Sequence, residues 1–401
     1  MSAGGFSTER LARLHAVMAG HVERGYVPGL VTLVSRRGEE QVDAIGTQAV
    51  GGSAPMRRDT IFRIASMTKP ITAVAALILI EECVIRLDEP VDRWLPELAE
   101  RRVLRRLDGP LDDTVPAQRP ISVRDLLTCR MGLGHILEAT GDFPIQQAID
   151  AQQLLQGSPV PEGLPGPDEW IRRVGTLPLV AQPGARWLYD LSLDVLGVLI
   201  ARAADQSLDT FFRERIFAPL GMGDTGFSVP AENRARLADS YQTDHATGGL
   251  IFSDGAGASR WNTTPAFQSG GGGLVSTVGD YLAFYRMLLN KGRHGRERIL
   301  SRPVVELMIT DQLMPEQKVA TEPLLGEHEG WGFGVAVRGR RDDIWATPGR
   351  FGWAGGLGTA AYADPAEGVI DILMTQRSLD SPDAGQVLGD FWTAVYGAID
   401  D

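Results

Sequence analysis

The sequence contains 401 residues, of which 43% are hydrophobic and 22% are charged, and it carries a formal net charge of -12 at pH 7. These fractions are typical of a soluble globular protein, and the negative charge argues against nucleic acid or an anionic membrane as a partner. No stretch approaches the roughly 18 uncharged apolar residues that a membrane span needs. The length exceeds one average domain, and it fits one large two-part unit as well as two separate domains.

The cysteines and histidines give no sign of a metal site. Cys83 and Cys129 form no CxxC pair, and the histidines form neither an HExxH motif nor a close pair. Free thiols are the rule in a reducing compartment. Met1 to Glu9 lacks the apolar core and the cleavage pattern of a secretory signal. We therefore expect a cytoplasmic protein that needs no metal and no cofactor.

The N-terminal segment has the pattern of a helix followed by a hairpin. Residues 7–24 bring apolar side chains near one helical face, and Pro28-Gly29 ends this helix. Residues 30–35 and 41–45 then have the pattern of two strands joined by a turn. A helix that leads into an antiparallel hairpin favours an α+β sheet domain.

An apolar, alanine-rich helix follows, from Ile64 to about Ile80. Ser66 and Lys69 lie three residues apart near its start, so a helix brings them to one face. A serine hydroxyl is a weak nucleophile until a neighbour removes its proton, and an amine one turn away can do so if burial lowers its pKa. The Ser-x-x-Lys pattern is frequent by chance and needs support from the rest of the chain.

The middle of the chain, residues 87 to 226, shows mainly helical patterns interrupted by proline and glycine. Ser122 has the position of an N-cap before an apolar helix that ends near Gly132. Tyr189 lies in a loop before a helix over residues 192–204.

Sheet patterns return near the C-terminus. A glycine run over residues 269–273 precedes an amphipathic helix over 278–290, and residues 382–398 form a closing helix. The three strands predicted between these helices cover residues 331–338, 358–363 and 368–374. We predict an α+β fold with an antiparallel sheet flanked by helices, built from residues 1–80 and 230–401, and an inserted, mostly helical domain over residues 81–229. A cleft at this boundary is a usual place for a site.

Three segments carry groups suited to acyl transfer. The first holds Ser66 and Lys69, the second holds Tyr189, and the third is the glycine-rich segment 353–356. A tyrosine can act as an acid or base if a cation such as Lys69 lowers its pKa. A glycine-rich strand edge can bring one N–H group close to a substrate, and the Ser66 N–H would complete an oxyanion hole. A packed core tyrosine and a tight hairpin are equally compatible with the local sequences.

Six stretches of the sequence, in the same order and at the same spacing, resemble the serine β-lactamase-like superfamily, in its class C β-lactamase and family VIII carboxylesterase branch. They are residues 62–69, 123–128, 183–189, 216–227, 272–277 and 352–359. This resemblance spans nearly the whole chain. It implies a β-lactamase/transpeptidase-like fold and a Ser-Lys-Tyr site.

The resemblance also implies a role for each of the matching residues. Ser66 would be the nucleophile, and Lys69 and Tyr189 would share proton transfer. The N–H groups of Ser66 and Gly356 would hold the tetrahedral intermediate. Water would then hydrolyse the acyl-Ser66 ester.

Two departures from the lactamase pattern point to the substrate. Lactamases of this branch carry Tyr-x-Asn, where this chain has Leu191, and Lys-Thr-Gly, where it has Trp353-Ala354-Gly355. Both changes remove polar recognition and add apolar surface, as in the family VIII esterases. We therefore expect hydrolysis of short-chain carboxylic esters. The residues expected to bind the substrate are Trp353, Gly355, Leu191 and Trp331, with Trp345 as a second candidate for the acyl pocket.

Other functions stay open at this point. The same acyl-enzyme chemistry serves a β-lactamase, a D-amino-acid or peptidoglycan peptidase, and an acyltransferase that passes the acyl group to an alcohol. A catalytically silent member that binds a ligand is the non-enzymatic alternative. An ordinary α/β-hydrolase is disfavoured because the chain has no Gly-x-Ser-x-Gly motif. The expected partner is a small-molecule ester or amide, and the oligomeric state is not readable from the sequence.

Overall fold

A seven-stranded antiparallel sheet forms the centre of the computed structural model, which describes residues 3–137, 143–154, 163–318, 321–381 and 384–401. Its strand order is β11-β12-β13-β14-β15-β1-β2. The strands are β1 (Gly29–Arg36), β2 (Glu39–Gly46), β11 (Glu329–Trp331), β12 (Ala336–Arg338), β13 (Phe351–Gly355), β14 (Thr359–Asp364) and β15 (Val369–Thr375). The predicted antiparallel sheet is thereby confirmed.

The two ends of the chain meet inside this sheet. Strand β1 pairs with β2 on one side and with β15 on the other, in the register Leu30↔Thr375 to Arg36↔Val369. All eight residues of β1 are buried, whereas the edge strand β2 is largely exposed or half-buried. A strand buried on both faces requires a hydrophobic layer on each side.

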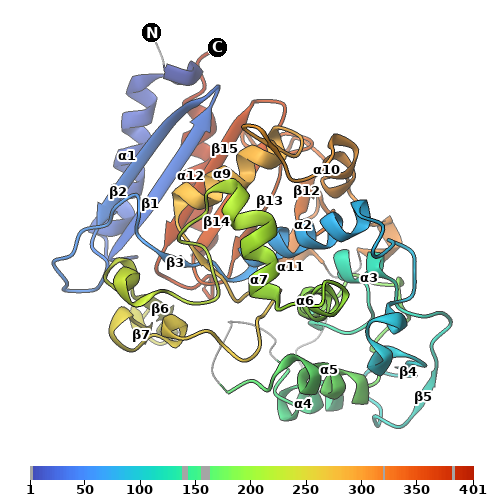
Figure 1. Ribbon diagram of the computed structural model, residues 1–401. Helices are drawn as coiled ribbons and strands as arrows, with labels where there is room; N and C mark the ends of the chain where they lie inside the picture. The colour runs from blue at the N-terminus through green and yellow to red at the C-terminus, as the bar shows by residue number, and fades with distance from the viewer. Residues whose placement is uncertain (1–2, 138–142, 155–162, 319–320, 382–383) are drawn as a thin grey trace.

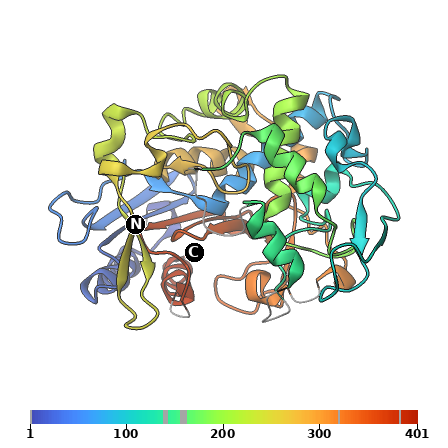
Figure 2. The ribbon, with the colours of Figure 1, turned by 90° about the horizontal axis from the view of Figure 1, so that it is seen from below.

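Helices supply these two layers (Figures 1 and 2). Helices α1 (Thr8–Glu23) and α12 (Ala384–Gly397) cover one face, where they pack on side chains such as Leu30 and Leu373. Helix α9 (Val278–Leu289) covers the other face with α2 (Thr68–Glu81), against residues such as Val31 and Ile372. Successive strand residues therefore enter opposite layers, as the pleat of a strand dictates.

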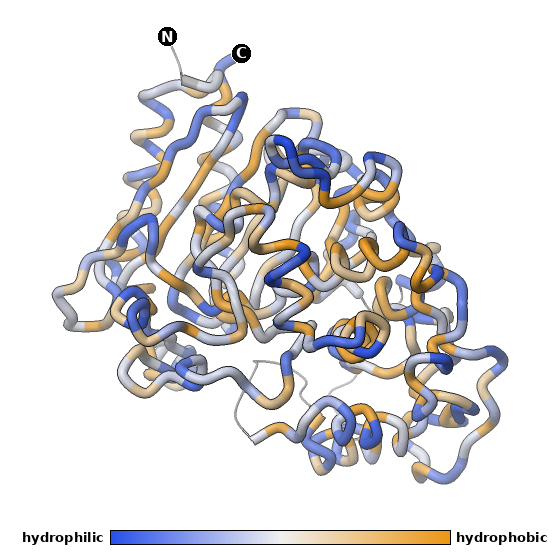
Figure 3. Tube along the Cα trace, viewed as in Figure 1, coloured by the Kyte–Doolittle hydropathy of each residue, from blue (hydrophilic) through white to orange (hydrophobic). Residues whose placement is uncertain are grey.

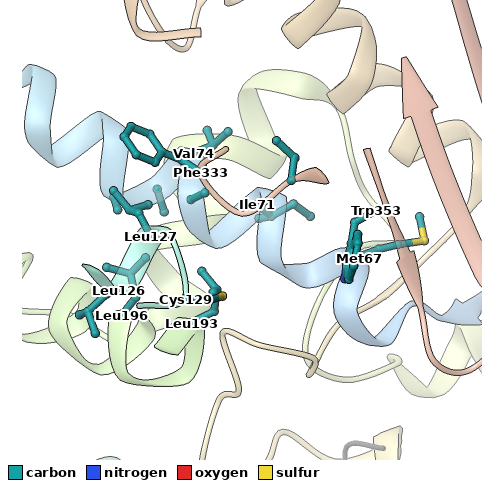
Figure 4. Packing of buried hydrophobic residues seen from close by; sticks show 14 of the residues in the cluster. Met67, Ile71, Val74, Leu126, Leu127, Cys129, Leu193, Leu196, Phe333 and Trp353 are labelled. Carbon is teal, nitrogen blue, oxygen red and sulfur yellow. The ribbon is translucent and has the colours of Figure 1, made fainter. Parts of the chain in front are cut away.

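Helix α2 lies in the interior of the protein. Every side chain from Thr68 to Leu79 is buried. Figure 4 shows Ile71 and Val74 of α2 together with Leu126 and Leu193 of the helical region. The sequence predicted one helix from Ile64, but a 3-10 turn over residues 65–67 comes first and the α-helix begins at Thr68.

The middle of the chain is mainly helical, and its hydrophobic residues are spread over several helices, among them α6 (Figure 3). Its helices are α3 (Val123–Leu127), α4 (Pro144–Ala151), α5 (Pro167–Thr176), α6 (Leu191–Ala203), α7 (Leu208–Phe212) and α8 (Ala218–Leu220). Ser122 caps α3 as predicted, in a capping box with Asp125. This helix ends at Leu127, earlier than predicted, because Cys129 adopts a positive φ of 54°. One buried hydrophobic cluster runs through this region and the sheet layer, and the division into two domains at residues 80 and 230 stays a prediction.

Short elements connect these layers. They are β3 (Phe62–Arg63), β4 (Arg102–Leu104), β5 (Thr114–Pro116), β6 (Ser240–Thr243), β7 (Leu250–Asp254), β8 (Val275–Ser276), β9 (Arg293–His294), β10 (Glu297–Arg298), α10 (Arg302–Met308) and α11 (Glu322–Leu325). The strand predicted over residues 331–338 is two strands, β11 and β12. Gly334 interrupts it with a φ of 70°, and a Cβ there would lie 2.8 Å from the Lys69 carbonyl oxygen. In the described ranges, no helix is both long and apolar enough to cross a membrane.

Candidate active site

Ser66 lies at the junction between β3 and α2, in the wall of a cavity of about 740 Å³. Its side chain is partly exposed, whereas the residues on either side of it are buried. Ala65 has a φ of 42°, a left-handed conformation that is uncommon for a residue with a side chain. Such backbone strain is frequent at functional sites and persists only where the surrounding structure enforces it.

Arg63, which lies just before this turn, helps to hold its backbone in place. Its guanidinium binds the Asp254 carboxylate and donates hydrogen bonds to the Ala238 carbonyl at 2.5 Å and to Ser259 Oγ at 3.1 Å. Both Arg63 and Asp254 are almost completely buried. A buried and fully paired charge fixes the path of β3, and therefore the place from which Ser66 projects.

Lys69 lies one turn after Ser66 and has no exposed surface. Its Nζ donates hydrogen bonds to Ser66 Oγ at 3.0 Å, to the Gly271 carbonyl at 2.7 Å and to the Asp190 carboxylate. An ammonium group has three N–H donors, so all three are used. The predicted proximity of Ser66 and Lys69 is therefore present.

The condition that the sequence reasoning set for Lys69 as a base, a pKa lowered by burial, is not met. Burial alone would lower the pKa, but the Asp190 carboxylate beside the ammonium outweighs it, and the pKa lies well above its ordinary value. Lys69 is consequently an ammonium ion at neutral pH. The sequence reasoning did not include a carboxylate as partner of this lysine.

Tyr189 faces the same ammonium group from the loop before α6. Lys69 Nζ lies 4.5 Å from the centroid of its ring, and the Trp353 indole N–H donates a 2.7 Å hydrogen bond to its phenolic oxygen. Burial raises the pKa of Tyr189, although Lys69, Ser66 and Trp353 each act to lower it. The lowering by Lys69 agrees with expectation, but burial is the larger effect.

Asp190 is the site residue that the sequence reasoning missed. It is the N-cap of α6, and its backbone has φ 97° and ψ -68°. Its only sequence signal is that it follows Tyr189 directly. Because it reaches a lysine 121 positions earlier in the chain, no local pattern reveals the contact.

The glycine run lies against α6 and carries one of the acceptors of Lys69. A Cβ at Gly270 would lie 2.6 Å from the Leu193 carbonyl oxygen, and one at Gly271 would lie 2.8 Å from the Asp194 carboxylate. Asp194 accepts hydrogen bonds from Ser269 Oγ at 2.6 Å and from the Gly271 N–H at 2.9 Å. The absence of side chains therefore lets this segment bring the Gly271 carbonyl to Lys69.

Strand β13 packs against the turn that contains Ser66. A Cβ at Gly355 would collide with the Ile64 carbonyl oxygen, so only glycine fits there. Gly356 follows in the turn to β14, and both it and Ser66 line the cavity. Among the described residues, no hydrogen bond from the N–H of Ser66 or of Gly356 is present. Two free N–H groups beside a serine hydroxyl are what an oxyanion hole requires.

The four predicted substrate-binding residues divide between the cavity wall and the core. Trp353 lines the cavity, as does Trp345, whereas Gly355 is buried and does not line it. Leu191 and Trp331 have no exposed surface, contrary to expectation. Leu191 starts α6 and points into the hydrophobic core, and Trp331 packs edge-on against Trp353 at 4.8 Å. Both therefore support the wall without reaching a ligand.

The cavity also contains residues that the sequence did not single out. His135 lies edge-on to Tyr189 at 6.0 Å, and burial lowers the pKa of its imidazole. Arg338 lines the cavity too, paired with Glu329 and Asp342. Apolar side chains form much of the cavity wall, among them Leu324, Leu325, Leu379, Leu388 and Trp392. Over the described ranges, no group of three or more potential His, Cys, Asp or Glu ligands is suited to a metal ion.

Known proteins resemble this chain over most of its length. The sequence model of the β-lactamase family matches residues 14–387. Protein Rv1367c of Mycobacterium tuberculosis (strain H37Rv) is 40% identical over 368 residues, which cover 89% of this chain and 88% of that protein. Esterase EstB of Burkholderia gladioli is 31% identical over 395 residues, which cover 92% of this chain and 91% of that protein.

Solved structures extend the similarity to the whole fold. The structure of EstCE1, described as a hydrolase with promiscuous acyltransferase activity, superposes with a TM-score of 0.80 at 25% identity. The match covers 97% of this chain and 98% of that one.

Proposed function

The chain belongs to the β-lactamase family, and on this premise we propose that it is a serine hydrolase that cleaves short-chain carboxylic esters through an acyl-Ser66 intermediate. The observation that carries the proposal is the 3.0 Å contact between Ser66 Oγ and Lys69 Nζ at the wall of a largely apolar cavity. Nucleophile and proton-transfer groups within hydrogen-bond reach are the signature of covalent catalysis.

The reaction proceeds by two acyl transfers. Ser66 Oγ attacks the ester carbonyl carbon while the adjacent pair of Lys69 and Tyr189 takes its proton. The carbonyl oxygen becomes an oxyanion, held by the N–H groups of Ser66 and Gly356. The carbon–oxygen bond to the alcohol then breaks, and the departing alkoxide receives the proton. Water repeats the attack on the acyl-Ser66 ester and releases the carboxylic acid.

The charges around Ser66 favour a neutral substrate over one with a carboxylate. Trp353 occupies the place of a lactamase lysine and uses its indole N–H on Tyr189. Of the cations beside the cavity, Lys69 is paired with Asp190, and Arg338 is paired with Glu329 and Asp342. Because no free cation stands beside Ser66 in the described part of the chain, an uncharged ester is the better match than a β-lactam carboxylate.

Acyl transfer to an alcohol is a second candidate. The cavity of about 740 Å³ is within the range that holds a drug-sized ligand, so it exceeds the needs of a short acyl group. EstCE1 is described as having both activities. An alcohol bound in the remaining space would compete with water for acyl-Ser66.

Acid quenching during turnover of p-nitrophenyl butyrate tests the proposal. We expect a butyryl adduct on the peptide that contains Ser66 and no adduct on the Ser66→Ala variant. Product analysis with an added alcohol then gives the ratio of hydrolysis to transfer. Ester turnover that persists at the wild-type rate in Ser66→Ala would overturn the assignment of the nucleophile.

A further inference from the structure

The ion pair between Lys69 and Asp190 is shielded from solvent. The Lys69 side chain has 0% exposure and the Asp190 side chain has 10%. The carboxylate contacts the same ammonium group that donates to Ser66 Oγ. In such a low-dielectric setting the attraction between opposite charges is strong, and an unpaired charge would be costly.

Asp190, which makes this contact, has strained backbone angles. Its φ of 97° and ψ of -68° lie near the γ-turn region, which is rare for residues other than glycine. Aspartate is a preferred N-cap residue because its carboxylate can accept N–H groups of the first helical turn. Here the Asp190 side chain makes no capping hydrogen bond to α6. It forgoes that stabilisation and binds Lys69 instead.

Other titratable groups surround Lys69, but none replaces this contact. Asp194, also on α6, acts on Lys69 from a greater distance, since its own hydrogen bonds go to Ser269 and Gly271. The titratable groups that interact with Lys69 are Tyr189, Asp190, Asp194, Cys129 and His135. Burial raises the pKa of Cys129 to about 12 and lowers that of His135, so both are neutral near pH 7. Two of these five groups are carboxylates, and of these two only Asp190 contacts the ammonium group directly.

We propose that Asp190 is a positioning residue that keeps Lys69 as an ammonium ion, so that Tyr189 and not Lys69 accepts the proton from Ser66. The proposal rests on the acyl-Ser66 chemistry proposed above and assigns its proton transfers. An ammonium group has no lone pair and can only donate hydrogen bonds. Lys69 therefore orients Ser66 Oγ and stabilises negative charge on its neighbour, while the base must be another group.

Tyr189 is the group in the correct place. Its phenolic oxygen already accepts a hydrogen bond from Trp353, and its ring lies against the Lys69 cation. Because burial and the Asp190 charge raise the pKa of Tyr189, its phenolate is a minor form near neutral pH. This minor form is the reactive one, and it has lost its proton to solvent. It takes the Ser66 hydroxyl proton as the Ser66 Oγ–carbon bond forms, and it returns this proton to the alkoxide as the ester bond breaks. Protons and electron pairs balance, and no further reactant is required.

The lysine content of the chain permits a direct test. The sequence contains three lysines, Lys69, Lys291 and Lys318, so protein labelled with 13C at lysine Cε gives three signals. Lys291 is exposed and Lys318 is half-buried. The double substitution Lys291→Arg and Lys318→Arg removes their signals, so that only the Lys69 signal remains. In the wild-type background this signal should remain that of an ammonium up to about pH 10. A Lys69 signal that titrates below about pH 8 in the wild-type background would overturn the proposal, and this measurement needs no change at position 190.

Asp190→Asn should move this titration. Without the Asp190 carboxylate, burial is opposed only by Tyr189 and the more distant Asp194. We expect burial to lower the pKa of Lys69, so an amine signal should appear below about pH 8. Asp380→Asn removes another acidic side chain, one that hydrogen-bonds Thr243, and serves as the matched control. Its Lys69 signal should be that of wild type. An unchanged Lys69 signal in Asp190→Asn would contradict the proposal.

A double-mutant cycle tests the assignment of the base. The readout is the rate at which an alkyl phosphonate labels Ser66, followed by intact mass. Tyr189→Phe should slow labelling about 10²–10⁴-fold in the wild-type background, but less than about tenfold when combined with Asp190→Asn, because a neutral Lys69 can then accept the proton. An equal loss in both backgrounds would overturn the proposal. Labelling without turnover of esters would instead count against the proposed ester hydrolysis alone.

Discussion

The indole N–H of Trp353 donates a 2.7 Å hydrogen bond to the phenolic oxygen of Tyr189. This bond joins the middle of β13 to the loop before α6, across 164 positions of the sequence. An indole nitrogen can only donate, so the phenolic oxygen must be the acceptor. Trp353, which stands where the resemblance places a lactamase lysine, therefore acts on the proposed proton-transfer group in addition to lining the cavity.

Trp353→Phe should shift the pH dependence of ester hydrolysis to higher pH. Burial raises the pKa of Tyr189, and the Trp353 hydrogen bond is one of the interactions that lower it. Loss of that bond raises the pKa further, so less phenolate is present at any given pH below it. We expect kcat/KM to fall about tenfold near neutral pH, with the rising limb of its pH profile displaced upward.

Trp187→Phe is the matched control for this shift. Trp187 also stacks on Tyr189, at 5.5 Å, but its indole nitrogen has no hydrogen-bond partner among the described residues. Its pH profile should keep the wild-type position. A Trp353→Phe profile that also keeps this position would contradict the role given to the bond.

Gly355→Ala should reduce both stability and turnover. The added Cβ would meet the Ile64 carbonyl oxygen, which belongs to the segment that carries Ser66. Either β13 or this segment must then move, at a cost of about 1–3 kcal/mol in the free energy of unfolding. Urea denaturation and kcat for p-nitrophenyl butyrate measure the two effects. Gly389→Ala on α12, where a Cβ meets no atom within 4 Å, should leave both essentially unchanged.

Leu191→Asn should not create lactam recognition, although it restores the asparagine of the lactamase motif. Leu191 is fully buried in the core, so the new amide would be shielded from both ligand and water. An unpaired amide and a lost apolar contact together should lower the free energy of unfolding by about 3 kcal/mol. Cephalosporin turnover by the variant would contradict this placement. Ile251→Asn, at a residue with 50% exposure, should leave stability almost unaltered.

Asp194→Asn should change how stability depends on pH. Burial, assisted by the charge of Asp190, raises the pKa of Asp194 from 3.8 to about 6. Between these two values the folded protein holds a proton that the unfolded chain has lost. The free energy of unfolding therefore falls as pH rises from about 4 to about 6, by about 3 kcal/mol from this group.

The asparagine variant lacks this titration and can still accept the Ser269 and Gly271 hydrogen bonds through its amide oxygen. Urea denaturation of both proteins at several pH values gives the difference in stability between them. We expect the wild type to lose stability relative to the variant across this interval. A constant difference would mean that Asp194 does not titrate there.

Features with a local sequence signal could be predicted from the sequence. The antiparallel sheet followed from apolar runs bounded by turn residues, and the pairing of Ser66 with Lys69 followed from helical spacing. The N-cap at Ser122 followed from its position before an apolar helix. In each case the residues that decide the structure lie within a few positions of one another.

The rest depends on contacts between distant segments. The strained backbone of Asp190, which turns a carboxylate onto Lys69, has no local signature, and for that reason the sequence alone does not indicate the raised pKa of Lys69. The inward orientation of Leu191 follows from the packing of α6 on α2. The division of residues 329–338 into two strands follows from the close approach of Gly334 to Lys69. Each of these requires the folded arrangement.

Ester hydrolysis at Ser66 is tested by parallel turnover of p-nitrophenyl butyrate and a chromogenic cephalosporin, with the wild type and with Ser66→Ala. We expect fast ester hydrolysis, slow or absent lactam opening, and the loss of both in the variant. Efficient opening of the cephalosporin by the wild type would contradict the claim that this site, with Trp353 at its wall and its cations paired, is built for neutral esters.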